Sequence, residues 1–526
     1  MILTPHFLIL LIIFITWAKA GLAGDWLLFT IDCITILYLT FYSKKIVADR
    51  KIILFLIPVI IICFQFYASC MNPSYRQLEN NDLAELDIIN LIKNEQNLSK
   101  KILTSEGIES VILTYSRDPS LATSLFFDLK NRYFDKFPSS TSSTAVLLEK
   151  YENLISLKPN PLVPCLAIFN YKLIYSFIHL ISQILIGVVF YSLLNDRKLI
   201  RSVCKILVIN AGVLSLLGIF QKINYVPGDD VLEIWGIWDT PEPRYYFASF
   251  TYKNHWSAFA LLMISLSTGL IVNSVQRKGL HNLSSPLNII MIINLLPLCI
   301  SIPLSGSRSG SILLVLLSLG IVLIIVLNFK FYKVKNLSLI AMSVIAFFAF
   351  CYFFTKIIDE KTTDEMNNNF DIQINNLNKG KYPLRILLWK DLLSQISEKP
   401  IFGHGFQSYR TINPAFQSNG VRTERNVVLN SAHSKFIPLI HSGHNEILEK
   451  ISEFGIFGFV VVIPLFCYIS RVFIITHSLF VKILIFGCSI FVLYSFIDFP
   501  SQTPICLITF SVVIGLLVKY HAISRT

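Results

Sequence analysis

Long stretches with almost no charge recur along this chain of 526 residues, and they constrain its fold more than any other feature. Each runs for roughly 17 to 25 residues, which is long enough to cross a hydrocarbon core of about 30 Å as a helix. The chain is 54% hydrophobic, as expected if these segments face lipid or one another. The pattern predicts an all-α polytopic membrane protein with about 12 transmembrane helices, centred near residues 10, 32, 60, 180, 212, 265, 295, 320, 346, 464, 490 and 511.

Basic residues gather after the even-numbered predicted helices. This is the positive-inside pattern, which predicts that both termini and the short loops are cytoplasmic. The net charge of +12 is therefore explained by topology and does not indicate a nucleic-acid partner. The residues concerned are Lys44, Lys45, Arg50, Lys51, Arg197, Lys198, Arg201, Lys205, Arg277, Lys278, Lys330, Lys333, Lys335, Arg471, Lys482, Lys519 and Arg525.

The long polar segments all lie outside under this topology, at roughly 71–164, 223–253 and 356–453. The working face is therefore predicted to be extracytoplasmic. We divide the chain into five segments: transmembrane helices 1–3 at 1–70, an extracytoplasmic insert at 71–164, helices 4–9 at 165–355, a large extracytoplasmic catalytic loop at 356–454, and helices 10–12 at 455–526.

Two alternatives concern the N-terminal part. The apolar run from Phe7 to Trp17 ends in a sequence that resembles a signal-peptide cleavage site, although no positive side chain precedes it. Cleavage there would leave the topology of the remaining helices unchanged. Cys70 and Cys165 flank the insert, and a disulfide between them is an open alternative to two free thiols in an oxidising compartment.

Two outward loops carry arginines beside helix starts. In SGSRSG, residues 305–310, glycines flank Arg308, and such a turn can direct backbone N–H groups and a helix dipole at an anion. In PEPRYYFASFTYKNHW, residues 241–256, Arg244 offers a bidentate fork to a phosphate. The alternatives are a plain turn with a snorkelling arginine and an interfacial aromatic belt with basic anchors.

The third outward loop contains RILLWKDLLSQISEKPIFGHGFQSYR, residues 385–410. Its apolar residues recur at helical spacing and predict a helix in the membrane interface, which ends at PIFGHGF. Arg385 and Arg410 either contact lipid phosphates or are solvated. The apolar residues are Ile386, Trp389, Leu392, Leu393 and Ile396.

HSGHNEILEKISEFGIFGF, residues 441–459, closes the loop, and helix is predicted from Asn445 onward. His444 then stands at the helix N-terminus, which disfavours the imidazolium and leaves a neutral ring able to accept a proton. A purely structural histidine and a metal site with His433 and His441 are the alternatives. Gly455 and Gly458 predict a surface that another helix can approach closely.

The same helix carries several charged or amide side chains. Glu446 and Lys450 are spaced for an i, i+4 pair. Asn445, Glu449 and Glu453 fall on one stripe of the helix.

The pattern HN-x9-G-x-x-G at residues 444–458 resembles the signature of the O-antigen ligase/polymerase family of bacterial membrane glycosyltransferases. Four further segments agree with that family in order. SFTYKNHWSAFALL is similar to its F-x-x-x-N element, SGSRSG to its Ser-Arg turn, and residues 385–409 to its R-x3-W…P-x-x-G-x-G segment. DFPSQTP, residues 498–504, is similar to the D-F-P-x-x-x-P before the last helix. The resemblance covers roughly residues 200–520.

This resemblance implies a C-type glycosyltransferase-like membrane fold at the periplasmic face of the bacterial inner membrane. It implies a glycan donor linked to undecaprenyl diphosphate and transfer without a metal or another cofactor. It carries over His444 as the catalytic residue and Arg308 and Arg244 as diphosphate-binding residues. Further substrate contacts are expected from Asn254, His255, Arg385 and Asn445.

Several functions are compatible with these residues. The favoured one is a ligase that joins a lipid-linked polysaccharide to lipid A-core, and the nearest alternative is a polymerase that adds repeat units to a growing glycan. A protein O-oligosaccharyltransferase is disfavoured because the chain ends soon after its last predicted helix. A transporter or flippase is disfavoured because no internal repeat or pair of broken helices is evident. Membrane lipids are expected partners.

Overall fold

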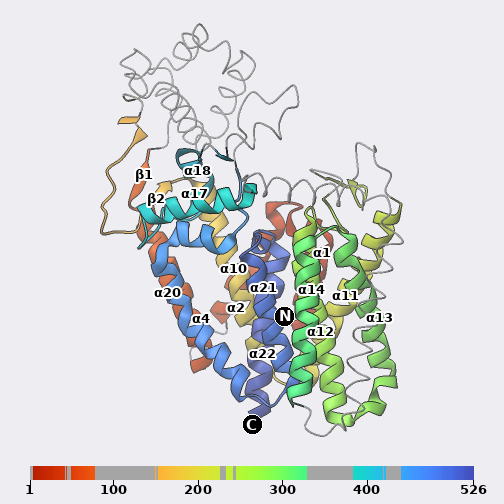
Figure 1. Ribbon diagram of the computed structural model, residues 1–526. Coiled ribbons are helices and arrows are strands. Elements are labelled where there is room, and N and C mark those ends of the chain that lie inside the picture. Colours follow the sequence, from red (N-terminus) through yellow and green to blue (C-terminus); the bar gives the residue numbers. More distant parts are fainter. Residues whose placement is uncertain are drawn as a thin grey trace. The chain divides into compact units, whose positions relative to one another are not determined.

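The computed structural model is helical throughout its membrane-spanning parts (Figure 1). It describes residues 4–41, 49–76, 155–224, 233–240, 245–328, 383–418 and 440–525, together with positions 43, 149, 152, 153, 420 and 421. Within these residues, eight helices are long and apolar enough to cross a membrane, so the all-α polytopic class is confirmed. They are α4 (Arg50–Cys70), α10 (Tyr171–Leu193), α11 (Arg197–Ile223), α12 (Lys253–Lys278), α13 (Pro286–Leu304), α14 (Arg308–Asn328), α20 (Glu446–Ile475) and α22 (Pro504–Arg525).

Shorter helices occupy three more of the predicted positions: α1 (Pro5–Trp17), α2 (Asp25–Phe41) and α21 (Leu479–Ser495). The helix predicted near residue 346 falls outside the described residues. The total of 12 therefore stays a prediction.

The chain forms two compact units, each assembled from separate stretches of sequence. Unit 1 comprises residues 1–55, 178–372 and 464–526, and unit 2 comprises 56–177 and 373–463. The described ends of the insert and the loop that carries His444 thus belong to one unit. The limits of the five segments predicted from the sequence stay a prediction.

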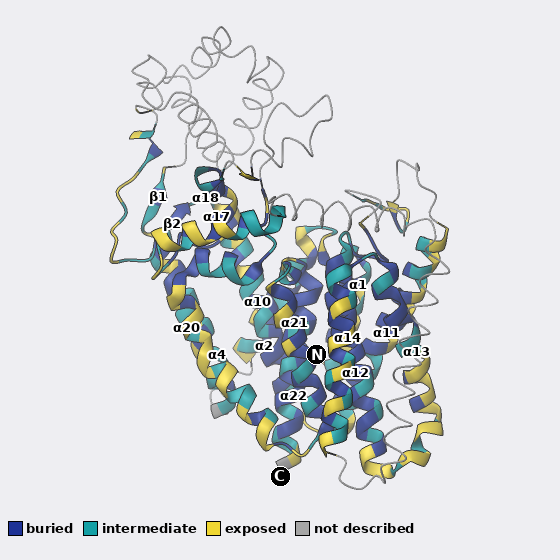
Figure 2. Cartoon of the chain, in the orientation of Figure 1, coloured by how far each residue is buried: buried dark blue, intermediate teal, exposed yellow. Residues whose placement is uncertain are grey.

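Helix α12 is the centre of unit 1 and packs against α11, α13, α14 and α21. Figure 2 shows it buried along most of its length, as expected for a helix that is apolar on every side. Small residues allow this close packing. A Cβ on Gly487 of α21 would lie 2.2 Å from the Ser265 hydroxyl of α12, and one on Gly310 of α14 would lie 2.6 Å from the Ser257 Cβ.

The two ends of this bundle differ in chemistry. At one end Lys482 donates to Asn328 (2.7 Å) and Arg197 donates to the carbonyl of Ile523 (2.8 Å). Arg277 and Lys278 end α12 there. The sequence predicts that these cations lie on the cytoplasmic side. The opposite end of α12 holds a polar cluster, described below.

Unit 1 also contains short elements beside the helices. The strands β3 (Glu233–Ile234) and β4 (Trp238–Asp239) pair as an antiparallel hairpin. The Trp235 indole in its turn donates to the carbonyl of Trp17 (2.9 Å). The described residues of the unit also form three 3-10 turns: η1 (Lys19–Gly21), η2 (Leu280–Ser284) and η3 (Pro500–Gln502).

The neck of the insert is closed in unit 2 by hydrogen bonds. The strands β1 (Pro73–Tyr75) and β2 (Leu166–Ile168) pair in parallel. The Asn72 side-chain amide donates to the carbonyls of Asn160, Val163 and Pro164, at 3.1–3.2 Å. Cys70 and Cys165 are free thiols, so the disulfide alternative is wrong.

Helices α17 (Leu384–Glu398) and α18 (Tyr409–Phe416) form the apolar core of unit 2 with the start of α20. Leu388 and Leu392 of α17 and Tyr409 of α18 are fully buried in it. Leu393 is 54% exposed, so the buried stripe of α17 is rotated from the one that apolar spacing predicts. Asp391 and Gln395 complete the buried face because they hydrogen-bond inside the unit.

Candidate functional site

His444 precedes α20 in a left-handed backbone conformation (φ +53°), which residues other than glycine adopt rarely. The Trp389 indole of α17 donates to the carbonyl of His444 (3.3 Å), and the His444 amide donates to the Ser442 hydroxyl (3.3 Å). The His444 side chain is half-buried. Backbone strain of this kind persists only where the surroundings impose it, and it concentrates at functional sites.

Asn445 is the N-cap of α20. Its side-chain oxygen accepts from the Leu448 amide (3.0 Å), which has no partner within the helix. Glu449, one turn later, accepts hydrogen bonds from the Ser442 hydroxyl and the Gly443 amide. The turn before the helix is therefore tied down on both sides of His444.

Charged residues continue along α20. Lys450 Nζ lies 2.7 Å from Glu453 Oε2, and this carboxylate is almost fully buried. Asn445, Glu449 and Glu453, which the sequence places on one stripe, are all buried. They face the interior of unit 2.

The PIFGHGF segment runs against the first turns of α20 through four backbone hydrogen bonds. His404 and Gly405 donate to the carbonyls of Ser452 and Glu453, both at 2.8 Å. Ile456 and Phe457 donate back to Pro400 and Ile401, at 2.8 and 3.0 Å. The loop between α17 and α18 is thus clamped onto the helix that begins beside His444.

Gly455 makes this clamp possible. Its backbone leaves the helical conformation (φ +68°, ψ −175°), which frees the next two amides to bind the loop. A Cβ there would lie 2.1 Å from the Ile401 carbonyl oxygen. Another helix does approach this stretch of α20, because Gln65 of α4 donates to the Phe454 carbonyl (2.8 Å), but at Gly455 itself the close neighbour is the loop. The glycine breaks the helix and admits a loop.

His404 is buried in this clamp, and its Nε2 lies 2.9 Å from the carbonyl oxygen of Gln395. Burial lowers the pKa of the imidazole to about 4, because a charged ring would lose its hydration. His404 is therefore neutral near pH 7 and donates to the Gln395 carbonyl.

In unit 1, a second polar cluster joins three of the segments that carry the family resemblance. The Asn254 amide donates to the buried Asp498 carboxylate, and the Ser307 hydroxyl donates to the Asn254 carbonyl oxygen (2.7 Å). Ser307 also lies 2.9 Å from the Tyr494 hydroxyl. The start of α12, the SGSRSG turn and the DFP segment therefore form one structure.

His255 lies in the same cluster. Its Nδ1 is 2.5 Å from the Thr503 hydroxyl, and its ring contacts Phe499 edge-on at 5.1 Å. Tyr252 stacks on Phe499 at 5.7 Å. Asn254 and His255 are both buried. Their observed partners belong to the protein, and a role in substrate binding stays a prediction.

Arg308 is the first residue of α14, as a turn that presents an anion-binding helix start requires. Gly306 before it adopts φ +78°, which favours glycine. Lys253, at the start of α12, lies close to this turn, because its Nζ would be 3.5 Å from a Cβ on Gly306. The Lys253 ammonium also lies over the Tyr245 ring, at 5.0 Å. The turn that leads into Arg308 thus lies near a second cation.

The predicted residues fall in both units. Arg308, Asn254 and His255 belong to unit 1, and His444, Asn445 and Arg385 to unit 2. Arg244 and His433 lie outside the described residues. Whether Arg308 and His444 face one substrate therefore stays a prediction. Among the described residues, no three His, Cys, Asp or Glu side chains are placed to hold a metal ion.

The structure adds contacts that were not predicted from the sequence. Asp498 and Ser307 hold the cluster in unit 1, and Trp389 and Ser442 hold His444 in unit 2. Asp498 and Trp389 do lie within segments that show the resemblance.

Comparison with known proteins gives one family match. Residues 293–463 match the family model described as O-antigen ligase. The match contains the SGSRSG turn, α17 and the start of α20, whereas Asn254 and Asp498 lie outside it. No curated protein matches the chain.

Proposed function

We propose a reaction for this chain on the premise that residues 293–463 match the O-antigen ligase family, which makes the chain a membrane glycosyltransferase of the O-antigen ligase/polymerase type. It transfers a glycan from an undecaprenyl-diphosphate donor to a hydroxyl of lipid A-core, at the periplasmic face of the inner membrane. The observation that carries the proposal is that one domain match includes both Arg308 and the His444–Asn445 helix start.

In this reaction the acceptor hydroxyl attacks C1 of the first sugar of the donor. The bond from C1 to the diphosphate oxygen breaks, and the diphosphate leaves with the electron pair. A single displacement of this kind inverts the configuration at C1. The hydroxyl proton passes to the His444 imidazole, and general base catalysis of this type contributes about 10²–10⁴ in rate.

Arg308 stabilises the charge that develops on the leaving diphosphate. Its place at the start of α14 adds the positive end of a helix dipole to its guanidinium. Arg244 is the second diphosphate-binding residue in the proposal. Removal of one such electrostatic contact typically costs about 10²–10³ in rate. Two guanidinium groups supply this stabilisation without a metal.

The matched variants His444→Ala and His441→Ala test the catalytic assignment in proteoliposomes. The substrates are an undecaprenyl-diphosphate-linked glycan and lipid A-core. His444→Ala is expected to lose at least 100-fold in transfer rate (roughly the lower limit for a general base). His441→Ala, an exposed residue of the same loop, is expected to keep it. Full activity of a stably inserted His444→Ala protein would sink the assignment.

Arg308→Ala is compared with Arg277→Ala, which replaces an exposed arginine in the last turn of α12. The first is expected to slow transfer and the second to leave it unchanged. Transfer should also persist in excess EDTA, and its loss would refute a metal-independent reaction.

A polymerase remains the second candidate because it uses the same donor chemistry. A deletion strain separates the two on a lipopolysaccharide gel. Loss of the whole polymeric ladder, with lipid-linked chains accumulating, indicates a ligase. Core capped with a single repeat unit indicates a polymerase.

A further inference from the structure

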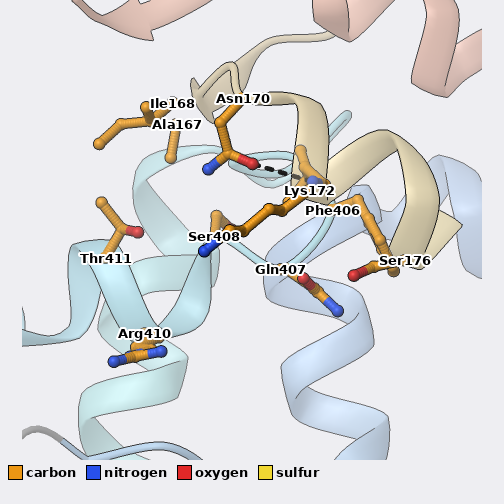
Figure 3. Close-up of a pocket in the computed structure, with 11 residues that line it drawn as sticks. Ala167, Ile168, Asn170, Lys172, Ser176, Phe406, Gln407, Ser408, Arg410 and Thr411 are labelled. Carbon is orange, nitrogen blue, oxygen red and sulfur yellow. Dashed lines mark hydrogen bonds between the residues drawn. The ribbon is translucent and has the colours of Figure 1, made fainter. Parts of the chain in front are cut away.

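A pocket of about 200 Å³ lies within unit 2, between the start of α10 and the start of α18 (Figure 3). Its size is several times what one water molecule needs. Two short stretches line it: residues 167–176 and residues 406–411. None of the residues proposed above for glycan transfer is part of its wall.

The charge of the lining is positive. Lys172 borders the pocket from α10 and Arg410 borders it from α18 (Figure 3). No carboxylate is present among the described residues that line it. Asn170, Ser176 and Gln407 add neutral polar groups. The predicted topology places this pocket on the outward face, where the positive-inside rule disfavours cations. Membrane topology alone therefore does not account for Lys172 and Arg410.

Two helices begin at this pocket. Asn170 caps α10, since its side-chain oxygen accepts from the Leu173 amide (2.9 Å). Ser408 is the N-cap of α18, yet its side chain makes no capping hydrogen bond. The first amides of each helix have no acceptor within the helix, and the positive ends of both dipoles add to the field of the two cations.

Ser408 gives independent evidence for a ligand. The residue is 2% exposed, and its hydroxyl has no hydrogen-bond partner among the described groups. A buried hydroxyl without a partner is costly, and an acceptor oxygen in the pocket would satisfy it. Gln407 beside it adopts φ +53°, a rarely populated backbone conformation.

We infer that this pocket binds a phosphate group, separately from the diphosphate contact assigned to Arg308. A guanidinium, an ammonium, a hydroxyl and two helix starts border the pocket, and together they match a tetrahedral anion with several acceptor oxygens. Tyr409 links the pocket to the transfer site. It stands between Ser408 and Arg410, and its hydroxyl would lie 3.2 Å from a Cβ on Gly443, the residue before His444.

The phosphate has two possible sources, which share this chemistry. One is a phosphorylated sugar of a glycan substrate, and the other is the headgroup of an anionic phospholipid. The full-length protein is placed in phosphatidylcholine nanodiscs, and binding of inorganic phosphate and of glucose 6-phosphate is compared with chloride at equal ionic strength. Parallel nanodiscs contain phosphatidylglycerol, and its retention is followed by native mass spectrometry.

Lys172→Gln and Arg410→Gln are each expected to weaken binding about tenfold, as loss of a charged hydrogen bond does. Ser408→Ala is a milder change and should weaken binding severalfold. The matched control is Lys158→Gln, which removes an exposed lysine of unit 2 that does not line the pocket. It should bind as the wild type does.

Binding of the soluble phosphates identifies a water-accessible phosphate, and retention of phosphatidylglycerol alone identifies a lipid headgroup. Both support the inference if the pocket variants lose them. Equal results for phosphate and chloride without lipid retention, or undiminished binding in Lys172→Gln and Arg410→Gln, would overturn it. His444→Ala should bind phosphate normally, so failure here and failure of the proposed transfer reaction are distinguishable.

Discussion

Replacement of Gly455 by alanine tests how the loop of unit 2 is held against α20. The residue combines φ +68° with ψ −175°, a region that is essentially restricted to glycine. The conformation costs about 1–3 kcal/mol for alanine. The new Cβ would also lie 2.1 Å from the Ile401 oxygen and 2.6 Å from the Phe402 nitrogen. Since backbone cannot rotate away as a side chain can, overpacking adds about 1–3 kcal/mol.

The total of roughly 2–6 kcal/mol is large beside the 5–15 kcal/mol that stabilises a typical domain. We expect the clamp to open locally. Hydrogen exchange of the full-length protein in detergent measures this at the four amides that hold the loop: His404, Gly405, Ile456 and Phe457. Because 1.4 kcal/mol corresponds to a factor of ten, their exchange should accelerate by at least about 30-fold.

Gly236→Ala is the matched control. This glycine also has φ +68°, but no atom lies within 4 Å of a Cβ placed on it. It should carry conformational strain in the hairpin of unit 1 and leave the four clamp amides unchanged. Exchange rates in Gly455→Ala that equal those of the wild type would refute the role assigned to this glycine.

Three further predictions follow from contacts in the two units. The free energy of unfolding should fall by about 3 kcal/mol as the pH drops from 6.5 to 4. The reason is that His404 binds a proton over this range in the unfolded chain, whereas in the folded protein its pKa is about 4. Chemical denaturation should show a flatter pH dependence for His404→Gln than for the wild type. Trp389→Phe removes the hydrogen bond to the His444 carbonyl. In steady-state kinetics it should lower kcat about fivefold and leave KM unchanged. A kcat equal to that of the wild type would contradict a positioning role for Trp389. Asp498→Ala removes one of the two acceptors of the buried Asn254 amide, the other being the Tyr252 hydroxyl at 3.0 Å, and should cost about 1–3 kcal/mol. An unchanged melting temperature would contradict this.

The sequence predicted the helices well because their signal is local. An uncharged stretch of about 20 residues has few alternatives to a membrane helix. The start of α20 beside His444 was also predictable, since Asn445 is a favoured capping residue and an apolar run follows it. These features depend on residues within a few turns of one another.

Features that depend on distant contacts were missed or misread. Asp498 meets Asn254 across 244 positions of sequence, and no local pattern announces that pair. Gly455 and Gly458 have the spacing of a helix-packing motif, but the first serves a backbone conformation that spacing does not reveal. Cys70 and Cys165 flank the neck of the insert, yet Asn72 closes it by hydrogen bonds.

A cryo-electron-microscopy structure of the full-length protein with bound undecaprenyl-diphosphate-linked glycan tests the central claim most directly. The account predicts that the diphosphate contacts the Arg308 guanidinium and that the His444 imidazole lies on the far side of the sugar C1, within hydrogen-bonding distance of an incoming hydroxyl. A diphosphate bound away from Arg308, or His444 and Arg308 facing opposite sides of the membrane, would contradict it.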